Sequence, residues 1–204
     1  MLVFIKLIIW IASLTPLSWL LYLGVNNQLG PDPGKALVDG LGLWALRLLL
    51  ITLLLRPLRE VTGNVVFIRV RRLIGLFCWF YATLHFAAGL FYVIGYSWAE
   101  ITKAFSERTY IILGLLAWLL LLPLGITSNR WAQRRLGRRW ARLHRAIYLI
   151  AVLACLHFIW LVRSDYWQPA LYFFLLMVLL AWRTPLLHGL ISERLRVRRL
   201  SISG

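Results

Sequence analysis

Long runs of apolar residues constrain this chain more than any other feature of its sequence. A helix that crosses a hydrocarbon core of ~30 Å needs about 20 mostly apolar residues, whereas a soluble helix shows apolar residues on one face only. Six segments meet this requirement: Leu7–Val25, Leu41–Leu58, Leu73–Ile94, Tyr110–Ile126, Ala146–Val162 and Trp167–Thr184. We therefore predict an all-α integral membrane protein, a bundle of six transmembrane helices that forms a single domain over residues 1–204.

Positive charge is concentrated in alternate connections between these segments. A net charge of +16 would suggest nucleic-acid binding in a soluble protein, but its distribution follows a membrane pattern. The stretches Arg56–Arg72 and Arg130–Arg145 and the tail from Arg183 carry +4, +7 and +4, whereas residues 26–40, 95–108 and 163–165 sum to −1, 0 and 0. Because basic loops stay in the cytoplasm, we predict that both termini, including the basic tail 185–204, are cytoplasmic.

The first apolar segment, with Lys6 near its start, also has features of a secretory signal peptide. No small-residue cleavage site follows it, and its removal would reverse the side predicted for every later loop. We therefore interpret it as the first span and, with no other targeting signal, expect a bacterial inner-membrane protein. No second folded domain, internal repeat, P-loop or glycine-rich dinucleotide motif is recognised.

Two histidines fall inside predicted spans, where ionisable residues are costly and usually functional. His85 lies 13 residues after Arg72, and His157 lies 12 residues after Arg145, which places them ~20 Å and ~18 Å from the basic end of their helices. Both helices run in the same direction, so the two imidazoles are expected at one depth in the outer half of the bilayer. Two facing neutral imidazoles are suited to bind both axial positions of a haem iron.

The alternative is that each imidazole only bonds a neighbouring carbonyl or side chain, and depth alone leaves that alternative open. Haem propionates are anionic and would need a cation nearby, for which Arg47 is the candidate. The alternative role of Arg47 is to extend its side chain to the outer interface.

His144 is a third candidate, at the basic end of the helix that carries His157. On an ideal helix the 13 residues between them leave the two side chains ~140° apart, so one ligand plane serves both only if the helix is distorted. The corresponding positions on the neighbouring helix hold Arg71 and Arg72 instead of a histidine. We consider His144, Arg71 and Arg72 as a candidate second haem or flavin site, with an interfacial histidine without a ligand as the alternative.

Motifs around these histidines resemble those of one family of membrane proteins. They are Leu29–Pro33, Arg56–Leu58, Arg69–Leu76, Ala82–His85, Leu136–Trp140, Leu143–Arg145 and Leu156–Phe158. In order and spacing, over nearly the whole chain, they resemble the MsrQ family (formerly YedZ), the haem-binding membrane subunits of a bacterial methionine sulfoxide reductase system. One departure is Thr109, where that family is expected to have proline.

This resemblance implies haem b and FMN as cofactors, and a relay role. Electrons would come from the membrane quinone pool or from flavin reduced by a cytoplasmic reductase. They would pass to MsrP, a periplasmic molybdenum enzyme that reduces methionine sulfoxide in oxidised periplasmic proteins. The chain would be the electron-transfer subunit of that oxidoreductase, with no catalytic residue of its own and no sulfoxide site.

More distantly, the pattern resembles the transmembrane part of ferric reductases and NADPH oxidases. Those proteins hold two haems with two histidine pairs, of which His85 and His157 match the outer pair and the inner pair is incomplete. They also carry a large cytoplasmic domain for flavin and nicotinamide, whereas only residues 185–204 follow the last span here. Two alternatives remain: a stand-alone haem reductase of ferric ions or oxygen, and a non-redox transporter or assembly factor whose histidines relay protons.

Overall fold

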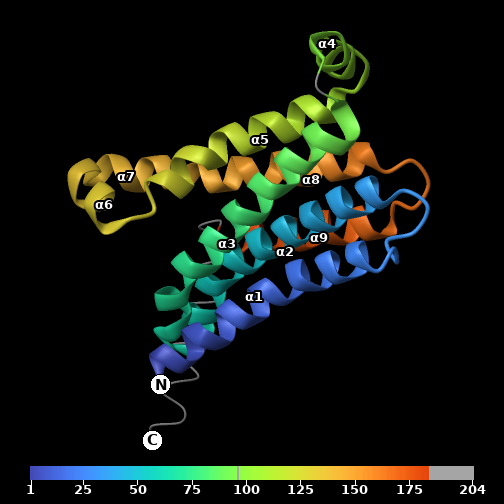
Figure 1. The fold of residues 1–204 in the computed structure, drawn as a ribbon. Helices are drawn as coiled ribbons and strands as arrows, with labels where there is room; N and C mark the ends of the chain where they lie inside the picture. The colour runs from blue at the N-terminus through green and yellow to red at the C-terminus, as the bar shows by residue number, and fades with distance from the viewer. Residues whose placement is uncertain (96, 184–204) are drawn as a thin grey trace, which may run out of the picture.

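A computed structural model describes residues 1–95 and 97–183, and within these ranges the chain is helical with short connections and contains no strand (Figure 1). The long α-helices are α1 Leu2–Val25, α2 Pro33–Thr62, α3 Val66–Gly89, α5 Thr109–Ile126, α8 Ile147–Leu161 and α9 Trp167–Ala181. The shorter elements are the π-helix η1 Leu90–Ile94, α4 Trp98–Glu107, α6 Arg130–Leu136, α7 Arg138–Leu143 and the 3₁₀ turn η2 His144–Ala146.

Five helical stretches in the described ranges are long and apolar enough to cross a membrane. They are Leu2–Val25, Pro33–Thr62, Val66–Ile94, Thr109–Ile126 and Arg138–Leu161, which include the first five predicted spans. α9 is apolar but has 15 residues, or ~22 Å of helix. The sixth span, predicted over Trp167–Thr184, therefore stays a prediction, and the tail 185–204 lies outside the described residues.

Short helices occupy two of the connections between the predicted spans, and α2 begins eight residues before its predicted span. Ser97 caps α4 with a reciprocal capping box, in which its hydroxyl accepts from Glu100 N–H at 3.1 Å. Asn129 caps α6 with a single hydrogen bond, in which its side-chain oxygen accepts from Ala132 N–H at 2.7 Å. Asp32 caps α2, so that Pro33 opens a helix instead of lying in a loop.

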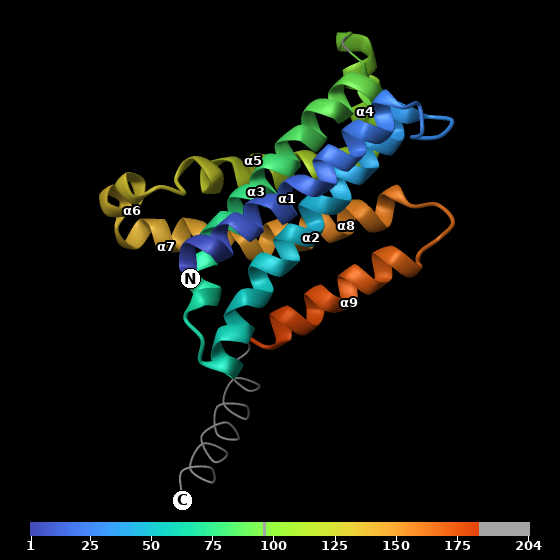
Figure 2. The same ribbon diagram turned by 60° about the horizontal axis from the view of Figure 1, so that its bottom comes forward.

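The helices pack as two antiparallel pairs with α1 and α9 beside them. α2 packs along α3 and α5 along α8, and these are the two most extensive helix contacts. In both views the α1–α2 and α8–α9 connections lie at one end of the bundle, while the N-terminus and α6–α7 lie toward the other (Figures 1 and 2). This arrangement agrees with the alternation of neutral and basic connections in the sequence.

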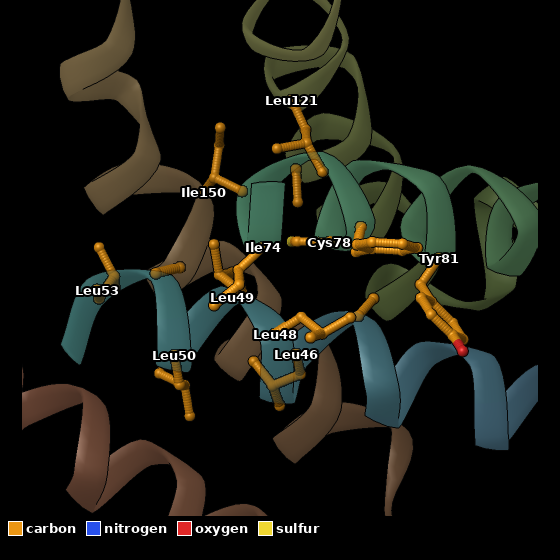
Figure 3. Packing of buried hydrophobic residues seen from close by; sticks show 14 of the residues in the cluster. Leu46, Leu48, Leu49, Leu50, Leu53, Ile74, Cys78, Tyr81, Leu121 and Ile150 are labelled. Carbon is orange, nitrogen blue, oxygen red and sulfur yellow. The ribbon is translucent and has the colours of Figure 1, made fainter. Parts of the chain in front are cut away.

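α2 is the central helix of the bundle. Half of its most apolar window is buried, against 11% for α1. Its leucines, including Leu49 and Leu53, meet Ile74 and Cys78 of α3 and Ile150 of α8 (Figure 3). The outer face of α1 stays exposed, with Phe4 73% and Trp19 59% exposed. Such a face suits a lipid environment, because lipid tails are as apolar as the residues that face them.

Tyr81 connects α1 to α3 through a hydroxyl at the edge of this core (Figure 3). The hydroxyl donates to Ser13 O at 2.7 Å and accepts from Leu17 N–H at 3.0 Å. Those two backbone groups would bond each other in a regular helix. The side chain therefore bridges a gap in the α1 ladder, next to Pro16, which lacks an N–H and disturbs the helix there.

Replacing Tyr81 with phenylalanine should lower the stability of the bundle by about 1–3 kcal/mol, because two backbone groups lose a partner in an apolar setting. Thermal unfolding of the purified protein in detergent measures the change. Tyr22→Phe on the half-exposed part of α1 is the matched control and should unfold like the unaltered protein. Equal unfolding temperatures for the Tyr81 and Tyr22 variants would contradict the bridging role.

Candidate functional site

His85 lies on α3 and faces α2 across a glycine. Its Nδ1 is 2.9 Å from the carbonyl oxygen of Val38. A Cβ atom on Gly42 would lie 2.8 Å from the imidazole Nδ1 and Cε1, which is closer than real side chains approach. The missing side chain of Gly42 is therefore what allows the ring to reach the backbone of α2.

His157 on α8 has the same environment against α5. Its Nδ1 is 2.6 Å from the carbonyl oxygen of Tyr110, and a Cβ on Gly114 would lie 2.8 Å from that nitrogen. A carbonyl oxygen only accepts hydrogen bonds. In both histidines Nδ1 therefore carries the ring hydrogen and donates a hydrogen bond to the carbonyl. The lone pair of each neutral ring is then on Nε2, the nitrogen left for a ligand.

The two rings lie close together in the middle of the helix bundle. Their centroids are 6.1 Å apart, and their planes are inclined by 79°. In each ring the edge formed by Cγ, Nδ1 and Cε1 faces its glycine, so the edge that carries Nε2 points away from that helix. The shared depth expected from the sequence agrees with this close approach.

A metal between these rings fits the observed spacing. Two imidazoles that ligate one metal through Nε2 hold their centroids roughly 6 Å apart, from metal–nitrogen bonds of about 2.0 Å and about 1.1 Å from each nitrogen to its ring centre. Within residues 1–95 and 97–183, no group of three or more His, Cys, Asp or Glu side chains is suited to hold a metal ion. Two axial ligands without further protein ligands suit a metal that arrives in a macrocycle, as in haem.

The carbonyls and glycines of this site were missed in the sequence, although a signal was present. The residues of one half are Val38, Gly42 and His85, and their counterparts in the other are Tyr110, Gly114 and His157, each numbered 72 higher. The triplets Leu-Gly-Leu and Leu-His-Phe recur at the same spacing, at 41–43 and 84–86 and again at 113–115 and 156–158. The expectation that the chain has no internal repeat was therefore wrong, because short matches between two apolar helix pairs are hard to distinguish from composition.

His144 lies at a distortion at the start of the helix that carries His157, which is the feature that a shared ligand plane would need. The 3₁₀ turn His144–Ala146 advances ~120° per residue instead of ~100°, which reduces the angular offset from His157 from ~140° to ~80°. The imidazole stacks on Trp140 at 3.9 Å and bonds the Trp140 carbonyl through Nδ1 at 3.1 Å. Its Nε2 is buried and makes no hydrogen bond of normal geometry in the described part of the chain, although the Leu124 backbone lies close enough to act on the imidazole.

The three candidate arginines are not gathered at one site. Arg71 is half-buried and lies near enough to His144 for its charge to act on the imidazole, whereas Arg72 is exposed. Arg47 contacts α9 instead: its Nε donates to the Tyr172 hydroxyl at 2.8 Å, and its guanidinium lies 4.8 Å from the centre of the Trp44 ring. Its role beside a propionate stays a prediction.

Comparison with known proteins identifies the family. Residues 41–155 match the family described as ferric reductase like transmembrane component. A protein of Xanthomonas axonopodis pv. citri (strain 306) is 48% identical over 184 residues, 87% of this chain and 84% of the relative. One of Xanthomonas oryzae pv. oryzae (strain MAFF 311018) is 45% identical over 200 residues, covering 95% and 91%. Both are named protein-methionine-sulfoxide reductase heme-binding subunit MsrQ. The chain belongs to the MsrQ family.

No solved structure matches this MsrQ-family chain. The family match includes α3 with His85 and the turn with His144, and it ends two residues before His157. The resemblance drawn from the sequence motifs is thereby confirmed at the level of the family and of its ferric reductase-like domain.

Adding a methyl group at Gly42 or Gly114 should displace the imidazole that faces it and weaken haem retention. Gly42→Ala or Gly114→Ala should retain haem about 5- to 100-fold more weakly, as expected from ~1–3 kcal/mol of overpacking. The haem-to-protein ratio after purification measures this. Gly89→Ala on α3 is the matched control, because a Cβ there meets nothing within 4 Å. Full haem content in both Gly42→Ala and Gly114→Ala would refute the role of these glycines in positioning the imidazoles.

Proposed function

We propose that this chain is a haem-containing electron-transfer subunit that carries electrons outward across a bacterial inner membrane. The observation that carries the proposal is the pair of imidazoles 6.1 Å apart, each with its Nδ1 committed to a backbone carbonyl. The relatives named as heme-binding subunits of a methionine sulfoxide reductase support it.

In this proposal His85 and His157 hold the iron of haem b through Nε2. The carbonyls of Val38 and Tyr110 accept hydrogen bonds from Nδ1–H, which fixes the tautomer and orientation of the rings and raises the basicity of Nε2. When bound, haem supplies one-electron chemistry at its iron. The protein holds both ligands on helices, so that gain or loss of an electron needs little rearrangement of the chain.

The number of protein ligands decides which chemistry the site favours. α2, α3, α5 and α8 enclose the pair, with Phe158 beside His157 in sequence and Phe86 beside His85. If both His85 and His157 held the iron, it would be occupied by protein ligands and would not be free to bind a substrate. An electron carrier needs no open position, so this ligand set favours a relay over chemistry on a bound substrate.

The direction of transfer is part of the proposal. With both termini cytoplasmic, the histidine pair lies in the outer half of the bilayer, near a periplasmic acceptor. We propose that the acceptor is an MsrP-like molybdenum enzyme, which reduces methionine sulfoxide in oxidised periplasmic proteins. We propose the quinone pool or a cytoplasmic flavin reductase as the donor, and His144 with Arg71 as the site for FMN or a second haem, because Nε2 of His144 is buried without a close hydrogen bond.

The match to a ferric reductase like component supports a second candidate, a stand-alone reductase of ferric ions or oxygen. Both candidates use the same haem, so spectra do not separate them. They differ in the acceptor that reoxidises the reduced protein.

Haem retention tests the ligand pair directly. His85→Ala or His157→Ala should remove most haem from the purified protein, since each is proposed as an axial ligand, and the b-type bands of the reduced spectrum should disappear. His188→Ala, in the basic tail, is the control for loss of a histidine and should keep its haem. Normal bands in both ligand variants would overturn the pairing.

Acceptor choice tests the relay. Protein reduced with dithionite and freed of excess reductant should be reoxidised by an MsrP-like enzyme with methionine sulfoxide, faster than by ferric citrate or oxygen. His144→Ala should keep the outer haem but lower the rate of reduction by menaquinol or reduced flavin. Reoxidation by oxygen or iron, with no response to the periplasmic enzyme, would instead establish the stand-alone reductase.

A further inference from the structure

Three arginines meet at the end of the bundle where α2 finishes and α3 begins. We call Arg56 of α2, Arg71 of α3 and Arg183, just after α9, the arginine cluster. Arg56 and Arg71 lie near enough to Arg183 for their charges to act on it, and the charge of Arg56 also acts on Arg71. The Glu60 carboxylate links Arg56 to Trp182, the residue before Arg183. Arg71 lies 14 residues before His85, or ~21 Å along α3, so the cluster is remote from the histidine pair.

Arg183 is held in place by contacts to two helices. One terminal nitrogen donates to the Leu53 carbonyl at 2.9 Å, and the other donates to the Tyr148 hydroxyl. The guanidinium carbon lies 4.6 Å from the centre of the Tyr148 ring. Nε, however, is buried and has no partner among residues 1–95 and 97–183. A buried charged donor without an acceptor is costly, so this nitrogen indicates a missing acceptor.

The nearby carboxylate does not balance the cluster. Glu60 accepts from Arg56 Nε at 2.9 Å and from the Trp182 indole N–H at 3.0 Å, so its two oxygens are already shared. One negative charge then stands against three positive ones. The cations are thus held together against their mutual repulsion.

We propose that the arginine cluster is a binding site for a phosphate group, which accepts from the Arg183 Nε and offsets the excess positive charge. Phosphate presents several acceptor oxygens to the planar donors of guanidinium groups, which makes arginine its preferred partner. The cluster lies where apolar spans end, so the phosphate belongs either to a phospholipid headgroup or to a soluble phosphate ester. Neither role depends on the haem proposed at His85 and His157, and of the three arginines only Arg71 also belongs to the second cofactor site proposed at His144.

The test uses full-length protein purified in a neutral detergent, with unfolding followed by tryptophan fluorescence. Sodium phosphate should raise the unfolding temperature by about 2–4 °C over sodium chloride of equal ionic strength. Arg56→Gln and Arg71→Gln should each lose at least half of that rise. They are chosen because Arg183→Gln also breaks contacts to Leu53 and Tyr148.

Arg69→Gln is the matched control, since it removes the same charge from an exposed position on the same helix and should respond like the unaltered protein. A second arm compares nanodiscs of phosphatidylcholine with nanodiscs that also contain phosphatidylglycerol. Stabilisation by phosphatidylglycerol identifies a headgroup, whereas stabilisation by free phosphate in pure phosphatidylcholine identifies a soluble ester. No advantage of either probe, or an equal response in Arg71→Gln and Arg69→Gln, overturns the site whatever the haem content.

Discussion

The hydrogen bond from a histidine Nδ1 to a helix carbonyl is the interaction on which the site depends. It is made twice, by His85 to Val38 and by His157 to Tyr110, and each time a glycine lets the ring approach the backbone. In an apolar interior an imidazole N–H without an acceptor would be costly, so the bond fixes both the tautomer and the direction of the ring. The positions of α2 against α3 and of α5 against α8 follow from the same requirement, because a larger residue at either glycine would force the helices apart.

The repeated arrangement is matched only in the half of the bundle that contains these histidines. At the other end the first pair of helices is joined by a short turn at Gly63, whereas the second is joined through α6 and α7 and continues through a 3₁₀ turn at His144. The three buried side-chain nitrogens without partners in the described chain, those of Trp79, His144 and Arg183, do not belong to the histidine pair. All three therefore lie outside the paired histidine sites, in which both Nδ1 atoms find acceptors within the chain.

Much of this architecture was predictable from the sequence because it rests on local composition. Apolar length predicted the five helical stretches that are long and apolar enough to cross a membrane, and counting residues from the basic ends predicted one level for His85 and His157, whose rings lie close together. Depth, however, says nothing about rotation about the helix axis, so the carbonyl partners and the role of Gly42 were not foreseen. Tyr81 was missed for a related reason, since a hydroxyl that replaces a backbone bond of α1 leaves no periodic signal. The helix of α4 was missed because it is short and half polar.

The 72-residue recurrence has a consequence for how the chain matures. Each half supplies a single imidazole, so neither half alone offers the pair that the proposed iron needs. On the proposed ligation, coordination would require both halves to have inserted and met in the correct register, and binding of the prosthetic group would act as a checkpoint on assembly of the whole bundle. A chain whose second half failed to pack against the first would bind no haem at this pair, so the haem absorbance would measure correctly assembled protein.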